Sequence, residues 1–207
     1  MRHIVATLLV TALTVPLSAL ASPSLLTNGS FEDGSVLASG TWGIYSALPG
    51  WQGGSTLGIE LRRNAAGTAQ DGSHFVELDT TGNSSMSQSV STTAGAHYLL
   101  SWYYSPRAGV AAASNAIEVF WNDVLLTTHT GSGIGFNDHQ WLSFSFDVVG
   151  TGGLDTVRFA AAGTSDSVGG SLDNVALVLQ PQAVPEPASL LLALGGLGLL
   201  AGCRRRG

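Results

Sequence analysis

Between about residues 22 and 183 the chain consists of short apolar or alternating segments separated by glycine, asparagine, aspartate and serine. The segments are rich in Val, Ile, Phe, Tyr, Trp and Thr, and none of them shows a long helical period. The pattern predicts strands at residues 25–32, 59–62, 74–79, 85–90, 97–104, 116–121, 124–128, 141–148, 156–161 and 172–179. Many short strands of this kind favour an all-β sandwich.

Alternation along the predicted strands also sorts side chains into an inner and an outer face, because successive side chains point to opposite sides of a sheet. In residues 97–104 it directs Tyr103 outward and Tyr98, Leu100, Trp102 and Tyr104 inward. In residues 116–121 it separates Phe120 from Trp121, so one of these two rings is expected near solvent. In residues 141–148 it directs Leu142, Phe144 and Phe146 to the core and leaves Trp141 at an edge.

The first 21 residues carry the features of a secretory signal peptide. Arg2 and His3 precede an apolar run over residues 4–13, and Ala19 and Ala21 occupy the small-residue positions before a cleavage site. Cleavage is expected before Ser22. The alternative is an uncleaved anchor helix, and both readings place the body of the protein outside the cytoplasm.

The last 24 residues, 184–207, differ in composition from the body. Pro185, Glu186 and Pro187 stop any preceding element, and an apolar run over residues 190–202 follows them. As a helix, this end of the chain would be roughly 24 Å long, which makes a short transmembrane span against a hydrocarbon core of about 30 Å. The terminal Arg204, Arg205 and Arg206 predict a cytoplasmic C-terminus in the inner membrane.

This combination of a Pro-Glu-Pro motif, a hydrophobic segment and a terminal arginine cluster closely resembles the PEP-CTERM sorting signal of Gram-negative bacteria. The resemblance implies that Pro185, Glu186 and Pro187 are recognised by a membrane-embedded exosortase after export by the secretion machinery. It also implies a cell-surface or extracellular protein associated with exopolysaccharide and biofilm production. Cys203 is read as a small apolar residue, with lipidation as the alternative.

Four short segments, at residues 26–32, 48–51, 71–78 and 171–177, resemble those of the galactose-binding-like jelly roll found in many carbohydrate-binding modules. The resemblance implies a structural calcium held by Glu32 and Asp173, near the two ends of the domain. Calcium takes six to eight oxygen ligands, and two neighbouring carboxylates would repel each other without a cation or water between them. The alternative is that Glu32 is a capping residue and Asp173 an acid in a solvated turn.

The charge distribution narrows the choice of partners. All eight basic residues are arginine, and residues 22–183 hold four of them against thirteen acidic residues, which gives 4 − 13 = −9. This balance argues against nucleic-acid binding, which requires clustered cations, and it favours a neutral glycan over an acidic one. A single cysteine excludes an intramolecular disulfide and a cysteine-based metal cluster.

Aromatic side chains are the expected sugar platforms, because the C–H face of a pyranose packs on a flat ring. Tyr103, Trp121 and Arg107 form the predicted ligand groove, since Arg107 begins a long loop beside an outward ring. For each tryptophan, packing in the core is the alternative. The function predicted is therefore a non-catalytic carbohydrate-binding module, with a structural matrix protein that acts through protein contacts as the alternative.

Catalytic motifs are weak in this sequence. It contains no Gly-x-Ser-x-Gly and no His-Glu-x-x-His motif, and the glycine-rich residues 131–135 lack the lysine of a phosphate loop. Glu77 and Asp79 fall on one face of a predicted strand about 7 Å apart, as a glycosidase pair would, but such pairs also arise by chance. His129 and His139 are expected to be exposed loop residues rather than metal ligands. We therefore expect no enzyme activity.

Overall fold

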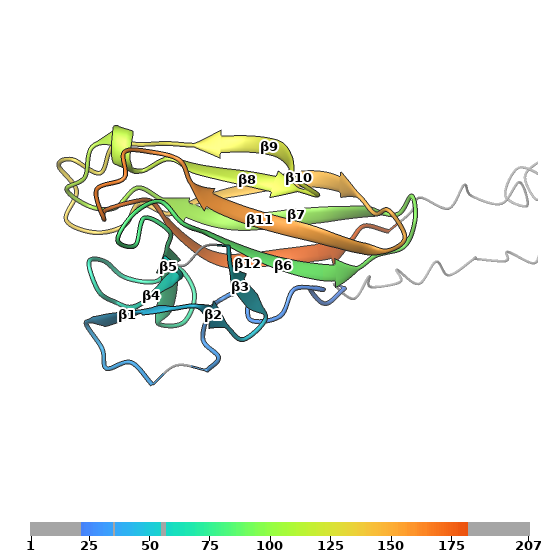
Figure 1. Cartoon of the computed structure of the whole chain (residues 1–207), viewed down its shortest axis with the longest axis horizontal. Coiled ribbons are helices and arrows are strands. Elements are labelled where there is room, and N and C mark those ends of the chain that lie inside the picture. Colours follow the sequence, from blue (N-terminus) through green and yellow to red (C-terminus); the bar gives the residue numbers. More distant parts are fainter. Residues whose placement is uncertain (1–21, 35, 55–56, 182–207) are drawn as a thin grey trace, which may run out of the picture.

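The computed structural model describes residues 22–34, 36–54 and 57–181, and these residues form a β-sandwich of two six-stranded sheets (Figure 1). Sheet A has the order β1-β4-β5-β12-β7-β10, and sheet B has the order β2-β3-β6-β11-β8-β9. The pairs of strands in both sheets are antiparallel. The prediction of an all-β sandwich is confirmed.

The bounds of the elements follow the alternating segments of the sequence. Sheet A contains β1 (Thr41–Tyr45), β4 (Ile59–Arg63), β5 (His74–Glu77), β7 (His97–Ser105), β10 (Leu142–Val149) and β12 (Ser171–Leu179). Sheet B contains β2 (Ala47–Leu48), β3 (Trp51–Gly53), β6 (Ser85–Ser91), β8 (Ile117–Trp121), β9 (Val124–His129) and β11 (Leu154–Ala161). The described part of the chain has one short 3₁₀ turn, η1 (Ala112–Ser114), and no helix in it is long and apolar enough to cross a membrane.

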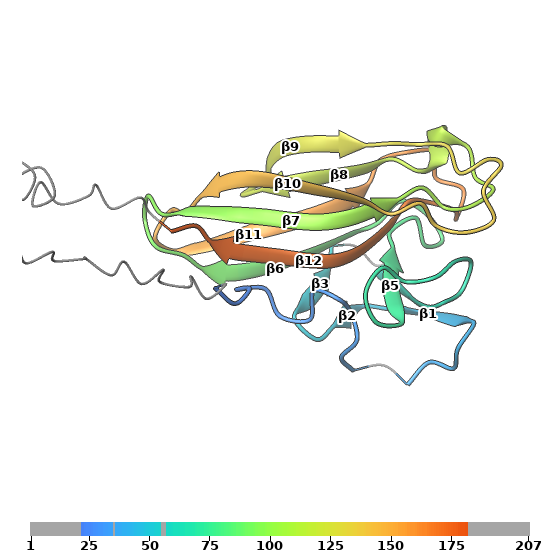
Figure 2. The same cartoon turned by 180° about the vertical axis from the view of Figure 1, so that it is seen from behind.

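The long strands lie side by side along the sandwich, and the short strands β1 to β5 gather below them at one end (Figure 1). Seen from behind, β10, β7 and β12 of sheet A lie in front of sheet B (Figure 2). One apolar cluster fills the space between the sheets and draws on both of them. Its largest fully buried rings are Trp51, Trp102, Tyr104, Phe31 and Phe159.

The predicted first strand, residues 25–32, is wrong. The segment consists of bends and turns, and Asn28 and Phe31 have φ values of 50° and 58°, which an extended strand cannot contain. It still lies along β12, where Leu25 N donates to Leu177 O and Val175 N donates to Gly29 O. The backbone bends because Phe31 turns into the core and packs its ring 5.7 Å from that of Trp51.

The sequence also missed β1, β2 and β3, which lie in the glycine-rich stretch after the first segment. These strands are only two to five residues long, so they offer too little alternation to be distinguished from loops.

Two predicted core positions of β10 also need correction. Leu142 is 55% exposed and Phe146 is 38% exposed, because β10 is the last strand of sheet A and has a neighbour only on one side.

Asn122 and Asp123 form the tight turn between β8 and β9, with φ values of 49° and 61°. Residues 1–21 and 182–207 lie outside the described residues. The predicted signal peptide with Ala19 and Ala21, the transmembrane tail and Cys203 therefore stay predictions from the sequence.

Candidate functional site

The outer face of sheet A carries a row of small hydroxyl side chains beside one aromatic ring. Tyr103 on β7 lies opposite Asp173 on β12 and Ser143 on β10. One step further along the strand, Ser101 lies opposite Ser145. Trp102 and Tyr104 are buried in the core, so Tyr103 faces outward as alternation predicts, and it remains partly exposed.

A second ring, Trp141, lies on the same face. It precedes β10 and packs against Phe75, a residue of β5 that faces away from the core, with ring centroids 5.9 Å apart. Its indole N–H donates to the carbonyl of Thr68 at 3.0 Å, and its ring lies 4.7 Å from that of His139. Trp141 is therefore held in place yet partly exposed. We call Tyr103 and Trp141, together with Ser101, Ser143 and Ser145, the platform.

The predicted groove of Tyr103, Arg107 and Trp121 does not form. Trp121 is only 7% exposed and donates from Nε1 to Val149 O, and Val149 lies opposite His97 at the start of β7. Arg107 follows the other end of β7. A strand of nine residues at about 3.3 Å per residue is roughly 26 Å long, so Trp121 and Arg107 lie near opposite ends of it. Alternation put Trp121 on the inner face of β8, and Phe120 is the outward ring, with the Arg158 guanidinium 3.6 Å above it.

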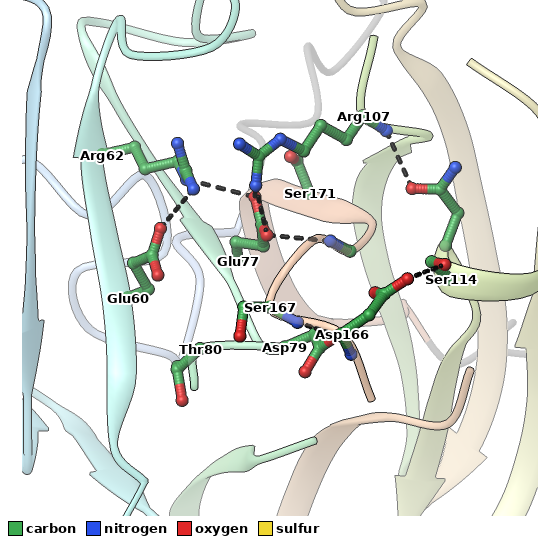
Figure 3. Close-up of polar contacts among 12 residues, drawn as sticks. Glu60, Arg62, Glu77, Asp79, Thr80, Arg107, Ser114, Asp166, Ser167 and Ser171 are labelled. Carbon is green, nitrogen blue, oxygen red and sulfur yellow. Dashed lines mark hydrogen bonds and ion pairs between the residues drawn. The ribbon is translucent and has the colours of Figure 1, made fainter. Parts of the chain in front are cut away.

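Arg107 belongs to a buried cluster of charges instead (Figure 3). Its Nη1 lies 2.9 and 3.2 Å from the two carboxylate oxygens of Glu77 on β5. Arg62 on β4 approaches the same carboxylate from the other side, with Nε at 3.1 Å, and also pairs with Glu60. The N–H of Gly169 donates to Glu77 at 2.8 Å. Arg107 is thus occupied by a buried carboxylate and is not free to bind a sugar.

Two acids and two arginines balance in this cluster. Burial raises the pKa of Glu77 to about 7, although the positive charges of Arg62 and Arg107 act to lower it. Burial also raises the pKa of Glu60. Because the four side chains come from β4, β5 and the segment after β7, the cluster fastens the loops at this end of the sandwich to sheet A.

Glu77 and Asp79, the candidate glycosidase pair, are both fully buried. Asp79 Oδ2 accepts the N–H groups of Asp166 and Ser167 at 2.9 and 3.0 Å, and Glu77 accepts the bonds described above. An inverting pair must leave room for a sugar and a water between its carboxyl groups. The geometry instead holds residues 166–169 in place, so it does not support glycoside hydrolysis at these two residues.

Glu32 and Asp173, the predicted calcium ligands, bind the two ends of the same segment, residues 70–74. Asp173 Oδ2 accepts the N–H groups of Gln70 and Asp71 at 2.8 and 3.0 Å. Glu32 Oε1 accepts the N–H groups of Ser73 and His74, both at 2.6 Å.

The negative charges of Glu32 and Asp173 suit a bound cation. Burial raises the pKa of Asp173 to about 7 even though backbone N–H groups act to lower it, and no arginine or histidine of the described residues forms an ion pair with it. Burial of Glu32 alone would raise its pKa, but hydrogen bonds from His74 and Ser73 outweigh this and lower it. The described residues contain no group of three or more His, Cys, Asp or Glu side chains suited to a metal, so further ligands would be main-chain or hydroxyl oxygens. Calcium binding stays a prediction.

The histidines are not the exposed loop residues that the sequence suggested. His139 is buried and bonded on both ring nitrogens, to Thr68 O and to Ser171 Oγ, each at 3.0 Å. His129 lies in β9 with its ring 3.8 Å from that of Phe144. The sequence did not show that Thr68 and Phe75 contact Trp141, because these contacts join residues far apart in the chain.

Comparison with known proteins identifies the C-terminal segment. Residues 183–206 match the PEP-CTERM protein-sorting motif, which confirms the resemblance noted for this end of the chain. The multifunctional-autoprocessing repeats-in-toxin of Vibrio cholerae is 28% identical over 165 residues, which are 79% of this chain. The chain spans only 3% of that toxin's length, and likewise 3% of the related Vibrio vulnificus toxin.

Solved structures with a similar fold include carbohydrate-binding modules. The arabinose-bound MgGH51 α-L-arabinofuranosidase matches with a TM-score of 0.52 at 12% identity, over 77% of this chain and 27% of the enzyme. TmCBM61, solved in complex with β-1,4-galactotriose, matches with a TM-score of 0.49 at 18% identity, over 77% of this chain and all of the module. The chain is thus a β-sandwich protein that carries a PEP-CTERM protein-sorting motif at its C-terminus.

Proposed function

We propose that this protein is an exported, non-catalytic carbohydrate-binding module that an exosortase sorts to the cell surface, where it associates with exopolysaccharide. The sorting motif at residues 183–206 supports export, and the sandwich is a fold shared with carbohydrate-binding modules. The observation that carries the proposal is the platform, where Tyr103 and Trp141 present two partly exposed rings beside serine hydroxyls.

The chemistry of the platform suits a sugar chain. The rings offer flat apolar surfaces to the C–H faces of pyranoses, and hydroxyl groups exchange hydrogen bonds with sugar hydroxyls. The small side chains of Ser101, Ser143 and Ser145 leave the sheet surface open beside the rings. The platform has no basic side chain, and the body carries an excess of acidic residues, so a neutral glycan is the proposed ligand.

The test is binding of the purified full-length protein to galactan, xylan, mannan and mixed-linkage glucan, with alginate as an acidic comparison. We expect binding to at least one neutral polysaccharide and a loss of at least tenfold in affinity in the Tyr103→Ala/Trp141→Ala variant. Phe120→Ala is the matched control, because it removes a partly exposed ring from the other sheet. Melting temperatures of the variants show whether they remain folded. Equal affinity of the platform variant and the wild type would exclude the platform as the glycan-binding site.

The alternative function, a structural matrix protein without a sugar site, is favoured by one feature of sheet A. Its edge strand β10 pairs only with β7 and exposes Leu142 and Phe146. The ladder between β10 and β7 has no bulge, and Asp147 is the only charged residue of β10. Little therefore prevents β10 from pairing with a strand of another protein. If Ser145→Pro in β10 disrupts assembly with matrix proteins while no polysaccharide binds the wild type, this alternative replaces the first.

Sorting by an exosortase is tested separately, on the protein recovered from its native cell. Mass spectrometry should find a chain that begins at Ser22 and ends near Pro187, after removal of the signal peptide and the tail. Substitution of Glu186 by Ala should leave the tail in place and the protein in the inner membrane. A mature protein that retains residues 1–21 or Arg204 to Arg206 would contradict the proposed processing.

A further inference from the structure

A groove with a volume of about 700 Å³ runs along β6 of sheet B, between that strand and the first described segment of the chain. Its lining includes Ser87, Ser89 and Ser91 of β6, Thr27 of the first segment and Gln52 of β3. On β6, these serines alternate with the buried side chains of Met86, Gln88 and Val90, so their hydroxyls point away from the core.

The walls of this groove are fixed by specific contacts. The side-chain amide of Gln88, itself 8% exposed, accepts the N–H of Thr27 at 2.8 Å and donates to the Thr27 carbonyl at 3.0 Å. At position 50 only glycine fits, because a Cβ there would lie 2.3 Å from Thr27 Oγ1 and the residue has a φ of 80°. The groove is thus a built feature and not a gap between loose segments.

One edge of β6 is also free along the groove. Strand β3 pairs with β6 only at Met86 and Ser87, and in the described part of the chain no other strand pairs with that edge. Main-chain groups of residues 88–91 on this side are therefore available to a bound molecule, in addition to the hydroxyls of Ser87 and Ser91. The Ser89 hydroxyl is hydrogen-bonded to that of Thr156 at 2.8 Å. No charged residue lines the groove, and Leu25 and Val90 supply its apolar surface.

We propose that this groove is a second glycan-binding site, for a neutral polysaccharide chain, and that the protein cross-links polysaccharide by binding one chain here and another on the platform. Uncharged hydroxyl and amide groups together with a small apolar surface match the donors, acceptors and C–H faces of a neutral sugar. The platform lies on the outer face of sheet A, the groove lies along the edge of β6 in sheet B, and the two sites share no residue. Two separate chains can therefore be held at once. The cross-linking rests on the proposed function, because it requires the platform to bind glycan.

The experiment compares binding and precipitation by the same four neutral polysaccharides, using the purified full-length protein. The groove variants are Gln52→Ala/Ser91→Ala and Ser91→Glu, which change exposed side chains. Thr128→Ala on β9 is the control, because it also removes an exposed hydroxyl from sheet B. The wild type and the control should make the polysaccharide solution turbid, and calorimetry with a short oligosaccharide of the same glycan should give two sites per chain.

Both groove variants should keep binding through the platform, lose the turbidity and show one site per chain. Turbidity and two sites in both groove variants would overturn the second site. A complete loss of binding in the platform variant would also overturn it, but would leave the proposed function standing. If the wild type binds none of the four polysaccharides, the proposed function and the second site fail together. Light scattering of each variant without polysaccharide shows whether self-association, and not a second site, causes the turbidity.

Discussion

The guanidinium group of Arg107 lies within hydrogen-bond distance of both carboxylate oxygens of Glu77, 30 positions earlier in the chain. The Glu77 side chain is 1% exposed, and the Arg107 side chain is 19% exposed. A buried ion pair contributes little net stability over an apolar pair, but removal of one partner leaves the other charge buried and unpaired. This relationship makes the end of the sandwich sensitive to single substitutions.

Arg107→Ala is expected to lower the free energy of unfolding by about 3 kcal/mol, because Glu77 then keeps only Arg62 and the Gly169 N–H as partners. Chemical denaturation at pH 7 measures the change. Arg158→Ala is the matched control, since the Arg158–Asp123 pair is exposed and such pairs contribute at most about 1 kcal/mol. Equal effects of the two substitutions would show that the buried cluster is not a point of sensitivity.

Stability should also depend on pH through Glu77. Its pKa is raised from 4.5 to about 7 in the folded protein, so between these values the folded state binds more protons than the unfolded state. The free energy of unfolding should therefore fall as the pH rises from about 4.5 to about 7, and the contribution should be constant above that range. One pKa unit corresponds to about 1.4 kcal/mol, so the expected decrease is about 3 kcal/mol or less.

Glu77→Gln separates this contribution from those of Glu60 and Asp173, whose pKa values are raised as well. The variant should be less stable than the wild type, but its stability should fall less steeply over the same pH range. Denaturation curves at intervals of half a pH unit measure both slopes. Parallel slopes would mean that Glu77 does not titrate in this range.

Gly29 is expected to be intolerant of any side chain. A Cβ at this position would lie 1.9 Å from the carbonyl oxygen of Val175, which is closer than two such atoms can approach. Gly29→Ala should therefore push the first segment away from β12 and destabilise the protein by about 2 kcal/mol or more. In Gly153→Ala the nearest atom is 4.0 Å away, so that variant should change the melting temperature little. A melting temperature for Gly29→Ala as high as that of Gly153→Ala would contradict the close approach.

The predicted calcium ion is tested by titration and chelation of the purified protein. Calcium should raise the melting temperature, EDTA should reverse the change, and Asp173→Asn should remove most of the response, because a buried carboxylate without a cationic partner gains most from a bound cation. Asp147→Asn is the control, since Asp147 is an exposed carboxylate on β10, a strand that does not neighbour β12. A melting temperature that neither calcium nor EDTA changes would show that the protein does not bind calcium at this site.

Much of the fold could be predicted because long alternating segments such as residues 97–104 give the strand, its faces and its buried rings at once. Alternation assigned Tyr103 to the outer face correctly, and it also put Trp121 on the side of Ile117 and Val119, which are in the core. It could not tell that Trp121 and Arg107 lie at opposite ends of the sandwich, because a side-chain period contains no information on how strands are placed along each other.

The parts that could not be predicted depend on contacts between distant residues. The bend at Asn28 and Phe31 follows from a ring that packs on Trp51, and the groove along β6 exists because Gln88 holds Thr27. The serines at positions 85, 87, 89 and 91 were a visible signal of a polar face. Their alternation could not reveal that the first segment of the chain forms a wall beside them.

If the proposed sorting leaves the protein held by its C-terminal side, the position of β12 has a mechanical consequence. This strand pairs with β5 on one edge and with β7 on the other, and it leads toward the sorting motif at residues 183–206. Tension applied along the strand would load the ladder with β7 in shear, so several hydrogen bonds would have to break together and not one after another. A protein held in this way would thus be pulled along the part of the sandwich whose hydrogen bonds are hardest to break one at a time.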